Sequence, residues 1–450
     1  MIISYKSCII GIRITDKKRA NSILGETTKI AMNVPEITQA QPITSDDDPT
    51  MKIAYITNCF GTQSHTFIRR EIQQLERIGV DITLFGIRKD PHGIPDIQNN
   101  TTYLYPLSVP TLILCNLKTF WRRPLHYFKG FIKAITSPEL SLARRSKMAY
   151  HYMAATKTAE QLTRANITHI HAHFMNVSAS IAMYASYHSN IPFSITVHSA
   201  GTFGTPHILG IPQKLEQAQH LAMISNYNID YFDNINACKN KSSVVRCGLD
   251  ISEFDFNPKK INKDKTIKLL AVGRFVEKKG FTHLIEAVRL AQEKGMQLEL
   301  AIIGDGPLKQ ELQKQAAPLN NAVTFLGQQP SGEVRRAMNN CDIVVIPSVT
   351  SASGEMEGLP VVIMEAMAVG RLVISTKHSG IPEIIINQET GYLADEKSPQ
   401  QIVSAIETIL EKNNEEQIII AARKKVQDEF NIETIAKLRK QLFETLNKGQ

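Results

Sequence analysis

The amino-acid sequence predicts an α/β protein with two doubly wound domains that face a cleft. From Met51 onward, short apolar runs alternate with longer stretches of helical periodicity. A polar, lysine-rich stretch at 257–265 interrupts the alternation, which restarts at Ile267. Continuous apolar strands separated by helices are typical of parallel sheets covered on both faces. Ligands of such sheets bind beyond the carboxyl ends of the strands, so residues that follow a strand are the candidates for a site.

The elements follow from these runs in chain order. In the first domain we expect strands at Lys52–Thr57, Asp81–Phe85, Thr168–His173, Phe193–His198, His220–Ile224 and Ser243–Arg246, with helices at Thr66–Ile78 and Lys147–Arg164. In the second we expect strands at Ile267–Val272, Leu298–Ile303, Val323–Leu326, Asp342–Ile346 and Leu372–Ser375. Its helices are expected at Thr282–Lys294, Leu308–Gln315, Gly332–Asn339, Pro360–Val369 and Pro399–Leu410, and an amphipathic helix at Ile432–Leu446 ends the chain.

These elements divide the chain into five parts. They are a flexible extension at 1–50, a first domain at 51–256, a linker at 257–266, a second domain at 267–430 and a final helix at 431–450. The extension is polar and ends in an acidic triplet that follows no strand, so we do not interpret the triplet as a metal site.

Composition narrows the class of protein. The 450 residues carry a formal charge of +8, with 43% hydrophobic and 21% charged residues, which excludes a wholly disordered or collagen-like chain. No run approaches the ~18 apolar residues of a membrane-spanning helix. The positive charge favours anionic partners such as phosphates or acidic lipid headgroups. Six widely spaced cysteines without a C-x-x-C pair predict reduced thiols in a cytoplasmic compartment.

The segment 354–370 carries the richest motif. Pro360 suits the first turn of a helix, so the backbone N–H groups around Gly358 and Leu359 would point, unpaired, into the cleft and bind a diphosphate. Glu357 before the helix and Glu365 on it suit the recognition of hydroxyl groups. The alternative is that Glu357 stabilises the helix N-terminus and that Glu365 is a solvated helix residue.

Two further turns follow strands of the second domain. Arg274 and Lys279 flank a turn after the first strand, where two cations can neutralise a diphosphate. The alternative is a solvated basic turn. Gly304 and Gly306 follow the second strand, and this spacing indicates that two backbone segments pass closely there.

Polar residues also follow strands of the first domain. Gly61 and Ser64 lie in a polar loop after the opening strand, and His198 ends another strand. His173 ends a strand on which three histidines alternate and share one face. A metal site is conceivable there, but the sequence places no carboxylate cluster beside these histidines, which favours a cleft-lining His173 at the strand's end instead.

Together these residues resemble glycosyltransferase family 4, a group of retaining, metal-independent enzymes of the GT-B fold, which has two Rossmann-like domains. The resemblance rests on Glu357 with Glu365, on the G-R-x-x-x-x-K-G element from Gly273 to Gly280, and on Gly304-Asp305-Gly306-Pro307. It covers about Met51 to the C-terminus. The sequence of residues 357–370 most resembles that of transferases of bacterial exopolysaccharide and lipopolysaccharide assembly, including the colanic acid type.

The resemblance implies a UDP- or GDP-linked sugar donor, a saccharide or lipid-linked saccharide acceptor, and neither cofactor nor metal. It implies that Arg274 and Lys279 bind the diphosphate, that Glu357 with Gly358, Leu359 and Pro360 holds the donor sugar, and that Glu365 holds the ribose. Gly304 and Gly306 would line the donor site, Gln328 would approach the base, and His198 would sit by the reacting sugar, with Gly61, Ser64 and His173 on the acceptor side. The catalytic set would be His198, Glu357, Arg274 and Lys279. The final helix would pack on the first domain.

Residues 118–147 hold eight basic residues against one acidic residue, interleaved with aromatic residues. This pattern suits contact with an anionic membrane at the cytoplasmic face of the inner membrane. The alternative is a solvated helical face whose aromatic residues lie in the core. No RNA-binding motif is present, so we expect no nucleic-acid partner.

Two other functions fit the same fold. One is a catalytically silent scaffold for polysaccharide assembly, against which the intact set of Arg274, Lys279, Glu357 and Glu365 argues. The other is a sugar-nucleotide epimerase, which would need no acceptor. A dehydrogenase is not favoured, because no G-x-G-x-x-G follows a strand.

Overall fold

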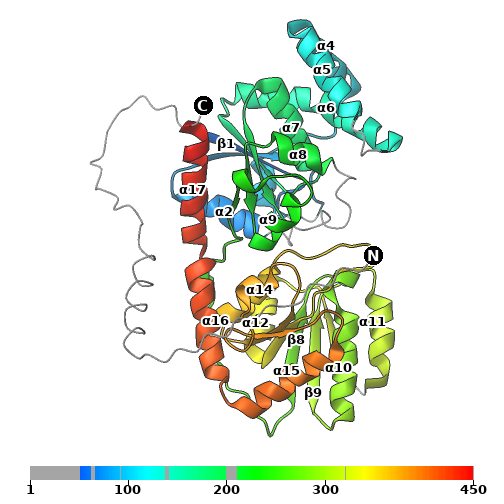
Figure 1. Ribbon diagram of the computed structural model, residues 1–450, viewed down its shortest axis with the longest axis vertical. Coiled ribbons are helices and arrows are strands. Elements are labelled where there is room, and N and C mark those ends of the chain that lie inside the picture. Colours follow the sequence, from blue (N-terminus) through cyan, green and yellow to red (C-terminus); the bar gives the residue numbers. More distant parts are fainter. Residues whose placement is uncertain are drawn as a thin grey trace, which may run out of the picture. The chain divides into compact units, whose positions relative to one another are not determined.

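Two parallel β-sheets with helices packed on their faces organise the chain, as the computed structural model shows (Figure 1), and this confirms the predicted fold class. The structure describes residues 51–61, 66–91, 93–136, 141–198, 210–319 and 321–448. The predicted extension at 1–50 and Ser64 lie outside the described residues.

The first sheet has the strand order β3-β2-β1-β4-β5-β6-β7, all parallel. Its strands are β1 (Lys52–Thr57), β2 (Asp81–Gly86), β3 (Thr101–Tyr103), β4 (His169–His173), β5 (Phe193–Val197), β6 (His220–Met223) and β7 (Ser242–Val244). Its helices are α2 (Thr66–Arg77), α3 (Pro95–Asn99), α4 (Val109–Arg122), α5 (Pro124–Ile135), α6 (Leu142–Arg164), α7 (Val177–Ser189), α8 (Ile211–Gln217) and α9 (Asn226–Asp233).

The second sheet has the order β10-β9-β8-β11-β12-β13, again all parallel. Its strands are β8 (Ile267–Val272), β9 (Leu298–Ile303), β10 (Val323–Gly327), β11 (Ile343–Ile346), β12 (Leu372–Thr376) and β13 (Tyr392–Ala394). The helices that follow are α10 (Phe281–Glu293), α11 (Lys309–Ala316), α12 (Ser331–Asn340), α13 (Val361–Ala368), α14 (Ile381–Ile384), α15 (Pro399–Lys412), α16 (Glu415–Glu429) and α17 (Ile432–Lys448).

The strand order reverses direction at one point in each sheet. In the first sheet the chain moves outward from β1 to β3 and then returns to place β4 on the other side of β1. In the second sheet it does the same at β8 and β11. Helices that leave neighbouring strands toward opposite faces open a crevice at such a point, where ligands of doubly wound folds bind. The residues that follow β1, β4, β8 and β11 are therefore the candidates for ligand sites.

Most predicted strands and helices are confirmed to within a few residues. The sequence analysis began α6 five residues late and did not give the helices α3, α4, α5, α7, α8, α9, α14 and α16 or the short strands β3 and β13. The buried side chains of α17 are Ile432, Ile435, Ala436, Arg439 and Phe443, whereas Leu438 is exposed. Among the described residues, no helix is long and apolar enough to cross a membrane.

Arg371 holds the start of the predicted linker against the second sheet. Its guanidinium is buried and donates to carbonyl oxygens of Asn257 (2.5 Å), Met338 (2.8 Å), Asn339 (2.7 Å) and Gly370 (2.8 Å). These carbonyls belong to the C-terminal ends of α12 and α13 and to the linker. The partial negative charge of two helix C-termini helps to stabilise the buried cation.

Candidate functional site

The carboxyl ends of β8 and β11 bring Lys279 and Glu357 together, although 78 residues separate them. The Lys279 Nζ atom donates to the Glu357 Oε2 atom at 2.9 Å, and the Lys278 Nζ atom lies 3.6 Å from Oε1. The turn that carries the lysines ends at Gly280, whose φ is +66°. A Cβ atom there would lie 1.9 Å from the Pro347 carbonyl oxygen, so only glycine fits.

A chain of hydrogen bonds through His378 and Glu396, which the sequence analysis missed, holds the Glu357 backbone. The Glu357 N–H donates to the His378 Nε2 atom at 3.0 Å, and the His378 Nδ1 atom lies 2.7 Å from the Glu396 carboxylate. Glu396 in turn accepts from the Thr350 N–H at 2.6 Å. His378 and Glu396 follow β12 and β13, the two strands beyond β11. The position of Glu357 is thus set from three neighbouring strand ends.

The two glutamates of the motif have pKa values shifted in opposite directions. Burial opposes ionisation of Glu357, but the ammonium groups of Lys279 and Lys278 outweigh it and lower the pKa of this carboxyl. Burial raises the pKa of Glu365 above its ordinary value, and the guanidinium of Arg70 offsets this only in part. Glu357 therefore stays a carboxylate at neutral pH, as a charged partner of the lysines must.

The other predicted donor residues surround this pair at the neighbouring strand ends. Arg274 is exposed after β8 and has no ion-pair partner within the described ranges. Gly304 follows β9 with φ +149°, and a Cβ atom there would lie 1.9 Å from the Gly273 carbonyl oxygen. This confirms the close backbone passage predicted at the glycine pair of Gly304 and Gly306. The Gly304 N–H donates to the carbonyl oxygen of Gly327, the last residue of the neighbouring strand β10, at 2.9 Å. Gln328, which is exposed, follows Gly327 directly.

Glu365 lies on α13, half-buried, and pairs with Arg70 of α2 at 3.5 Å. Arg70 also lies 3.4 Å from Glu253, which Arg335 approaches at 3.3 Å. The alternative of a solvated Glu365 is therefore wrong. The interpretation of Glu365 as a ribose ligand stays a prediction, and the Arg70 guanidinium would share the carboxylate with that ribose.

Glu383 links helix α14 to α9 of the first sheet. It accepts from the Tyr227 N–H at 3.0 Å and from the Asn226 side chain at 3.1 Å, at the start of α9. The Arg246 guanidinium donates to it at 2.9 Å. Burial opposes its ionisation, but these donors outweigh burial and lower the pKa of the Glu383 carboxyl.

The predicted acceptor-side residues lie at the ends of β1, β4 and β5, which are neighbours in the first sheet. His198 and His173 stack with ring centroids 5.4 Å apart, and the His173 Nδ1 and His198 Nε2 atoms lie 3.1 Å apart. Phe67 and Phe174 contact the His198 ring, which is buried. Gly61 lines a separate small hollow with Cys59, Thr66 and Ile94. The structure therefore brings the histidines together but not Gly61 with them.

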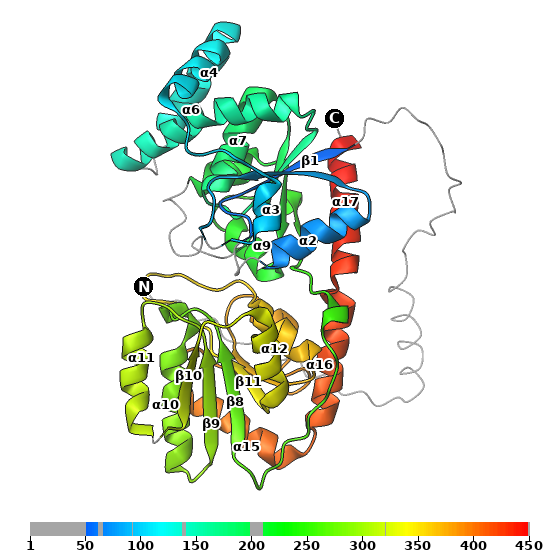
Figure 2. The same cartoon turned by 180° about the vertical axis from the view of Figure 1, so that it is seen from behind.

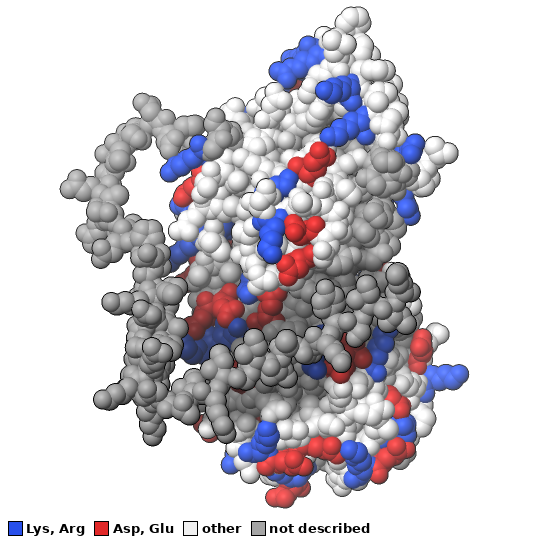
Figure 3. Space-filling view, viewed as in Figure 1, with Lys and Arg blue, Asp and Glu red and all other residues white. Residues whose placement is uncertain are grey.

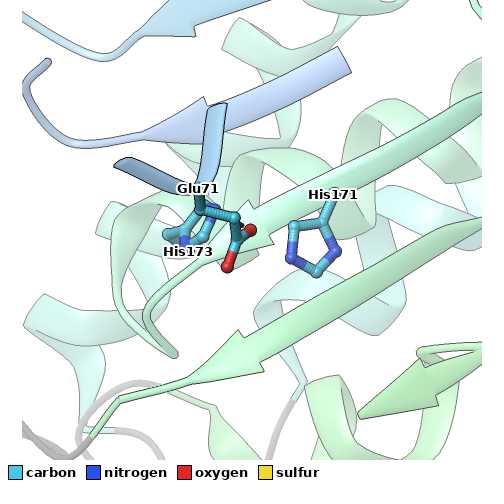
Figure 4. Close-up of side chains that lie close together, drawn as sticks. All are labelled: Glu71, His171 and His173. Atoms are coloured by element: carbon cyan, nitrogen blue, oxygen red, sulfur yellow. Dashed lines mark ion pairs between the residues drawn. The ribbon is translucent and has the colours of Figure 1, made fainter. Parts of the chain in front are cut away.

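Behind these histidines lies a buried polar network that sequence reasoning missed. Glu71 of α2 accepts from the Tyr55 hydroxyl at 2.7 Å and from the Arg439 guanidinium of α17 at 3.2 Å, and its carboxylate lies 3.7 Å from the His173 Nε2 atom. Figure 4 shows the Glu71 carboxylate between the His171 and His173 rings. Glu71, His173 and Arg439 are all buried, so the network joins the final helix to the histidine cluster.

Glu71, His171 and His173 present potential metal ligands within 4.8 Å of one another. Both His171 ring nitrogens, however, already lie within 2.8 Å of the hydroxyls of Ser194 and Thr196. The Arg439 guanidinium also lies 3.5 Å from His171. A cation placed among these groups would face a guanidinium and would have to break existing hydrogen bonds. The arrangement favours a hydrogen-bonded network around Arg439 over a metal site.

Buried histidines predict that the protein loses stability in mild acid. Burial lowers the pKa of His169 to about 3 and those of His151 and His220 to about 4, against 6.5 for the free side chain. The folded state therefore binds fewer protons, so this stability is complete above pH 6.5 and is lost as the pH falls toward 4. Each histidine contributes up to about 1.4 kcal/mol per pH unit in that window. The free energy of unfolding in urea should fall by several kcal/mol from pH 7 to pH 5.

Glu365 acts in the opposite sense, because its raised pKa makes the folded state bind a proton more readily above pH 4.5. One carboxyl does not offset three histidines. A His169→Asn variant should show a shallower pH dependence than the parent protein. Equal free energies of unfolding at pH 7 and pH 5 would contradict the prediction.

Comparison with known proteins connects this geometry to a family. Residues 253–426 match the family described as Glycosyl transferases group 1. The match covers less than half of the chain. The amylovoran biosynthesis glycosyltransferase AmsK of Erwinia amylovora is 37% identical over 194 residues, 42% of this chain and 47% of that protein. WcaL of Escherichia coli K12, named as a colanic acid biosynthesis glycosyltransferase, is 34% identical over 213 residues, 46% of this chain and 52% of that protein.

Both matches span about half the length of the relative. A solved structure of HepE from Anabaena, in complex with UDP and glucose, superposes with a TM-score of 0.64 at 18% identity, covering 88% of this chain and all of that one. This likeness shows the GT-B fold. The matched residues include Lys279, Glu357 and the His378–Glu396 pair, whereas His198 and the Glu71 network lie outside them.

Proposed function

We propose that this protein transfers a sugar from a nucleotide-sugar donor to a saccharide acceptor in the synthesis of an extracellular polysaccharide. The observation that carries the proposal is the pairing of Lys279 with Glu357 at the carboxyl ends of β8 and β11, between which the strand order of the second sheet reverses. The names of AmsK and WcaL support the polysaccharide context. The UDP in the HepE complex supports a UDP-linked donor, with a GDP-linked donor as the alternative.

Neutralising the leaving diphosphate is the central chemical task of such a transfer. Arg274 is exposed and available for it, and Lys279 lies where a diphosphate can compete with Glu357 for its ammonium group. The backbone N–H groups at the start of α13, around Gly358 and Leu359, add a third positive pole. Preorganised cations of this kind stabilise the charge that develops on the departing phosphate. We propose that the reaction proceeds in this way without a metal.

Glu357 would hold the donor sugar through its hydroxyl groups, with its backbone fixed by His378. We propose that Glu365 binds the ribose once Arg70 yields part of the carboxylate, and that Gln328 approaches the base. His198 would contact the reacting sugar. We propose attack by the acceptor hydroxyl on the face that the phosphate leaves, with retention of configuration and with the phosphate accepting the proton. A trapped covalent glycosyl-enzyme would contradict this mechanism.

The acceptor in this proposal is a saccharide linked to a lipid. Its lipid would sit in a membrane, so the proposal includes peripheral contact of this cytoplasmic protein with an anionic membrane surface. Gly61, His173 and His198 would face the acceptor side.

Thermal unfolding in the presence of nucleotides tests the donor site of the full chain. UDP, GDP and ADP, each free and sugar-linked, are compared at equal concentration. A nucleotide at 100 times its dissociation constant should add about 2.7 kcal/mol to the free energy of unfolding. We expect one base to stabilise the protein, more strongly when sugar-linked. Product analysis then separates transfer to an acceptor from epimerisation of the donor. A folded protein that none of these nucleotides stabilises would contradict the proposed donor site.

A further inference from the structure

Helices α4 and α5 form a hairpin that packs on α6 and projects from the first domain (Figure 1, Figure 2). The inner side of the hairpin is tied down by polar contacts. The Asn116 amide donates to the Met153 carbonyl at 3.1 Å and accepts from the Tyr127 hydroxyl at 2.7 Å. The Tyr152 hydroxyl donates to the Tyr127 carbonyl at 2.7 Å. The hairpin is therefore held on the domain in one orientation.

The opposite side of the hairpin, its outer face, consists of large apolar side chains that lie in solvent. The exposed fractions are 86% for Leu125, 78% for Trp121, 65% for Leu114 and 60% for Phe128. The full set is Val109, Ile113, Leu114, Leu117, Phe120, Trp121, Leu125, Phe128 and Ile132. At 100° per residue, the members on α4 fall within one arc of the helix, and so do those on α5. The alternative of aromatic residues buried in the core is wrong for Trp121 and Phe128.

Cations flank the outer face, and no carboxylate interrupts it. The segment 109–135 contains Lys118, Arg122, Arg123, Lys129 and Lys133, all exposed, and neither aspartate nor glutamate. Lys118 and Lys133 approach Glu160 and Glu216 of other helices. The remaining three have no ion-pair partner in the part of the chain that the structure describes. Figure 3 shows blue Lys and Arg side chains among uncharged atoms at the upper end of the view.

We infer that the outer face of the α4–α5 hairpin docks on an anionic lipid surface, with its apolar side chains in the acyl region and its cations at the headgroups. An apolar arc bordered by lysine and arginine is the pattern of helices that lie in a membrane interface. Each cation near such a surface adds roughly fivefold to partitioning. Trp121 between the apolar and basic residues suits the boundary between acyl chains and headgroups.

Charge favours a lipid surface over the other occupants of an apolar face. Two copies of this chain joined through the outer face would place Arg122, Arg123 and Lys129 of one copy against the same cations of the other, which is unfavourable. A nucleic acid would satisfy the cations but would leave the aliphatic side chains without an apolar partner. Anionic lipid satisfies both. The purpose of this docking rests on the proposed function, since it would bring the acceptor side to a lipid-linked acceptor, but the surface itself does not depend on it.

Trp121 is the only tryptophan in the chain, so its fluorescence reports directly on the outer face. The full-length protein is mixed with vesicles of phosphatidylcholine and phosphatidylglycerol, or of phosphatidylcholine alone, at low salt and at about 0.5 M salt. We expect a blue shift of the emission and co-sedimentation with the anionic vesicles, both weakened by salt. Leu125→Ser combined with Phe128→Ser should lower the vesicle-bound fraction tenfold or more.

The matched control is Ile420→Ser on α16, which also removes an exposed apolar side chain but should leave vesicle binding unchanged. Arg122→Glu combined with Lys129→Glu should abolish the preference for phosphatidylglycerol. Three results would overturn the inference: no binding to anionic vesicles at low salt, binding that the Leu125 and Phe128 changes do not reduce, or a blue shift that depends on protein concentration without vesicles. The last result would assign the face to a second copy.

Nucleotide stabilisation keeps this inference separate from the proposed function. If UDP or GDP stabilises the protein but anionic vesicles do not bind it, the proposed donor site is supported and the proposed docking surface is contradicted. If the protein binds vesicles through the outer face but no nucleotide stabilises it, the docking surface is supported and the donor site is contradicted.

Discussion

Replacing Lys279 by alanine should lower the turnover of sugar transfer by roughly 10²–10³, the effect of removing one preorganised electrostatic contact. The Lys279 ammonium lies 2.9 Å from Glu357, at the strand end where we propose that the diphosphate binds. Its loss would leave Glu357 with Lys278 alone, at 3.6 Å. Initial rates at saturating donor, with the nucleotide identified by thermal unfolding, measure the change.

Lys278→Ala is the matched control for this experiment. Lys278 lies next to Lys279 in sequence but approaches Glu357 less closely and also lies near Glu355, at 3.9 Å. We expect less than a tenfold loss of turnover from it. Urea unfolding should show that both variants are folded, and Lys279→Ala should lose stabilisation by the nucleoside diphosphate. Turnover near that of the parent protein in Lys279→Ala would remove this residue from the donor site.

Replacing Arg439 by methionine should cost about 3–5 kcal/mol of the free energy of unfolding, the effect of breaking a buried ion pair from one side. Methionine fills most of the same volume but leaves the Glu71 carboxylate buried with only the Tyr55 hydroxyl as a strong donor. The exposed Lys437 on the same helix supplies the control, and Lys437→Ala should change stability by no more than about 0.5 kcal/mol.

The double variant Glu71→Gln with Arg439→Met makes this prediction testable even if the single variant does not fold. A neutral amide needs no counter-charge and can still hydrogen-bond to Tyr55, so the double variant should recover most of the lost stability. Urea unfolding of the parent protein, the two single variants Glu71→Gln and Arg439→Met, and the double variant gives the coupling free energy between the two residues. A double variant as unstable as Arg439→Met alone would show that the cost comes from lost packing of α17 and not from an unpaired charge.

The local features of this protein were predictable from its sequence, because they depend on neighbours along the chain. The uninterrupted apolar run of β11 and the largely apolar run of β8 indicated parallel strands, and Pro360 indicated the start of α13 within one residue. The tight turn at Gly304 followed from the need for a residue without a Cβ atom. Placing Glu357 and Lys279 after strands was enough to predict one shared edge, since all strands of a parallel sheet end on the same side.

Charge pairing and solvent exposure were decided only by the tertiary structure. Arg439 occupies a core position of α17, four residues from Ile435 and from Phe443, and this spacing is the one signal in the sequence that a charge would be buried there. Its partner Glu71 is 368 residues away, and only the packing of α17 on α2 brings the two together. The same holds for Glu365 and Arg70.

The α4–α5 hairpin shows that the sequence also does not reveal which apolar surface stays exposed. Periodicity reveals that a helix has an apolar arc, and it does so for buried and exposed arcs alike. Whether another element covers the arc depends on where the rest of the chain goes. For α13 the arc is buried in the second domain, whereas for α4 and α5 it lies in solvent. The sequence by itself therefore determined the elements and their polarity, and the folding of distant segments over them decided which charges are paired and which apolar surface is free.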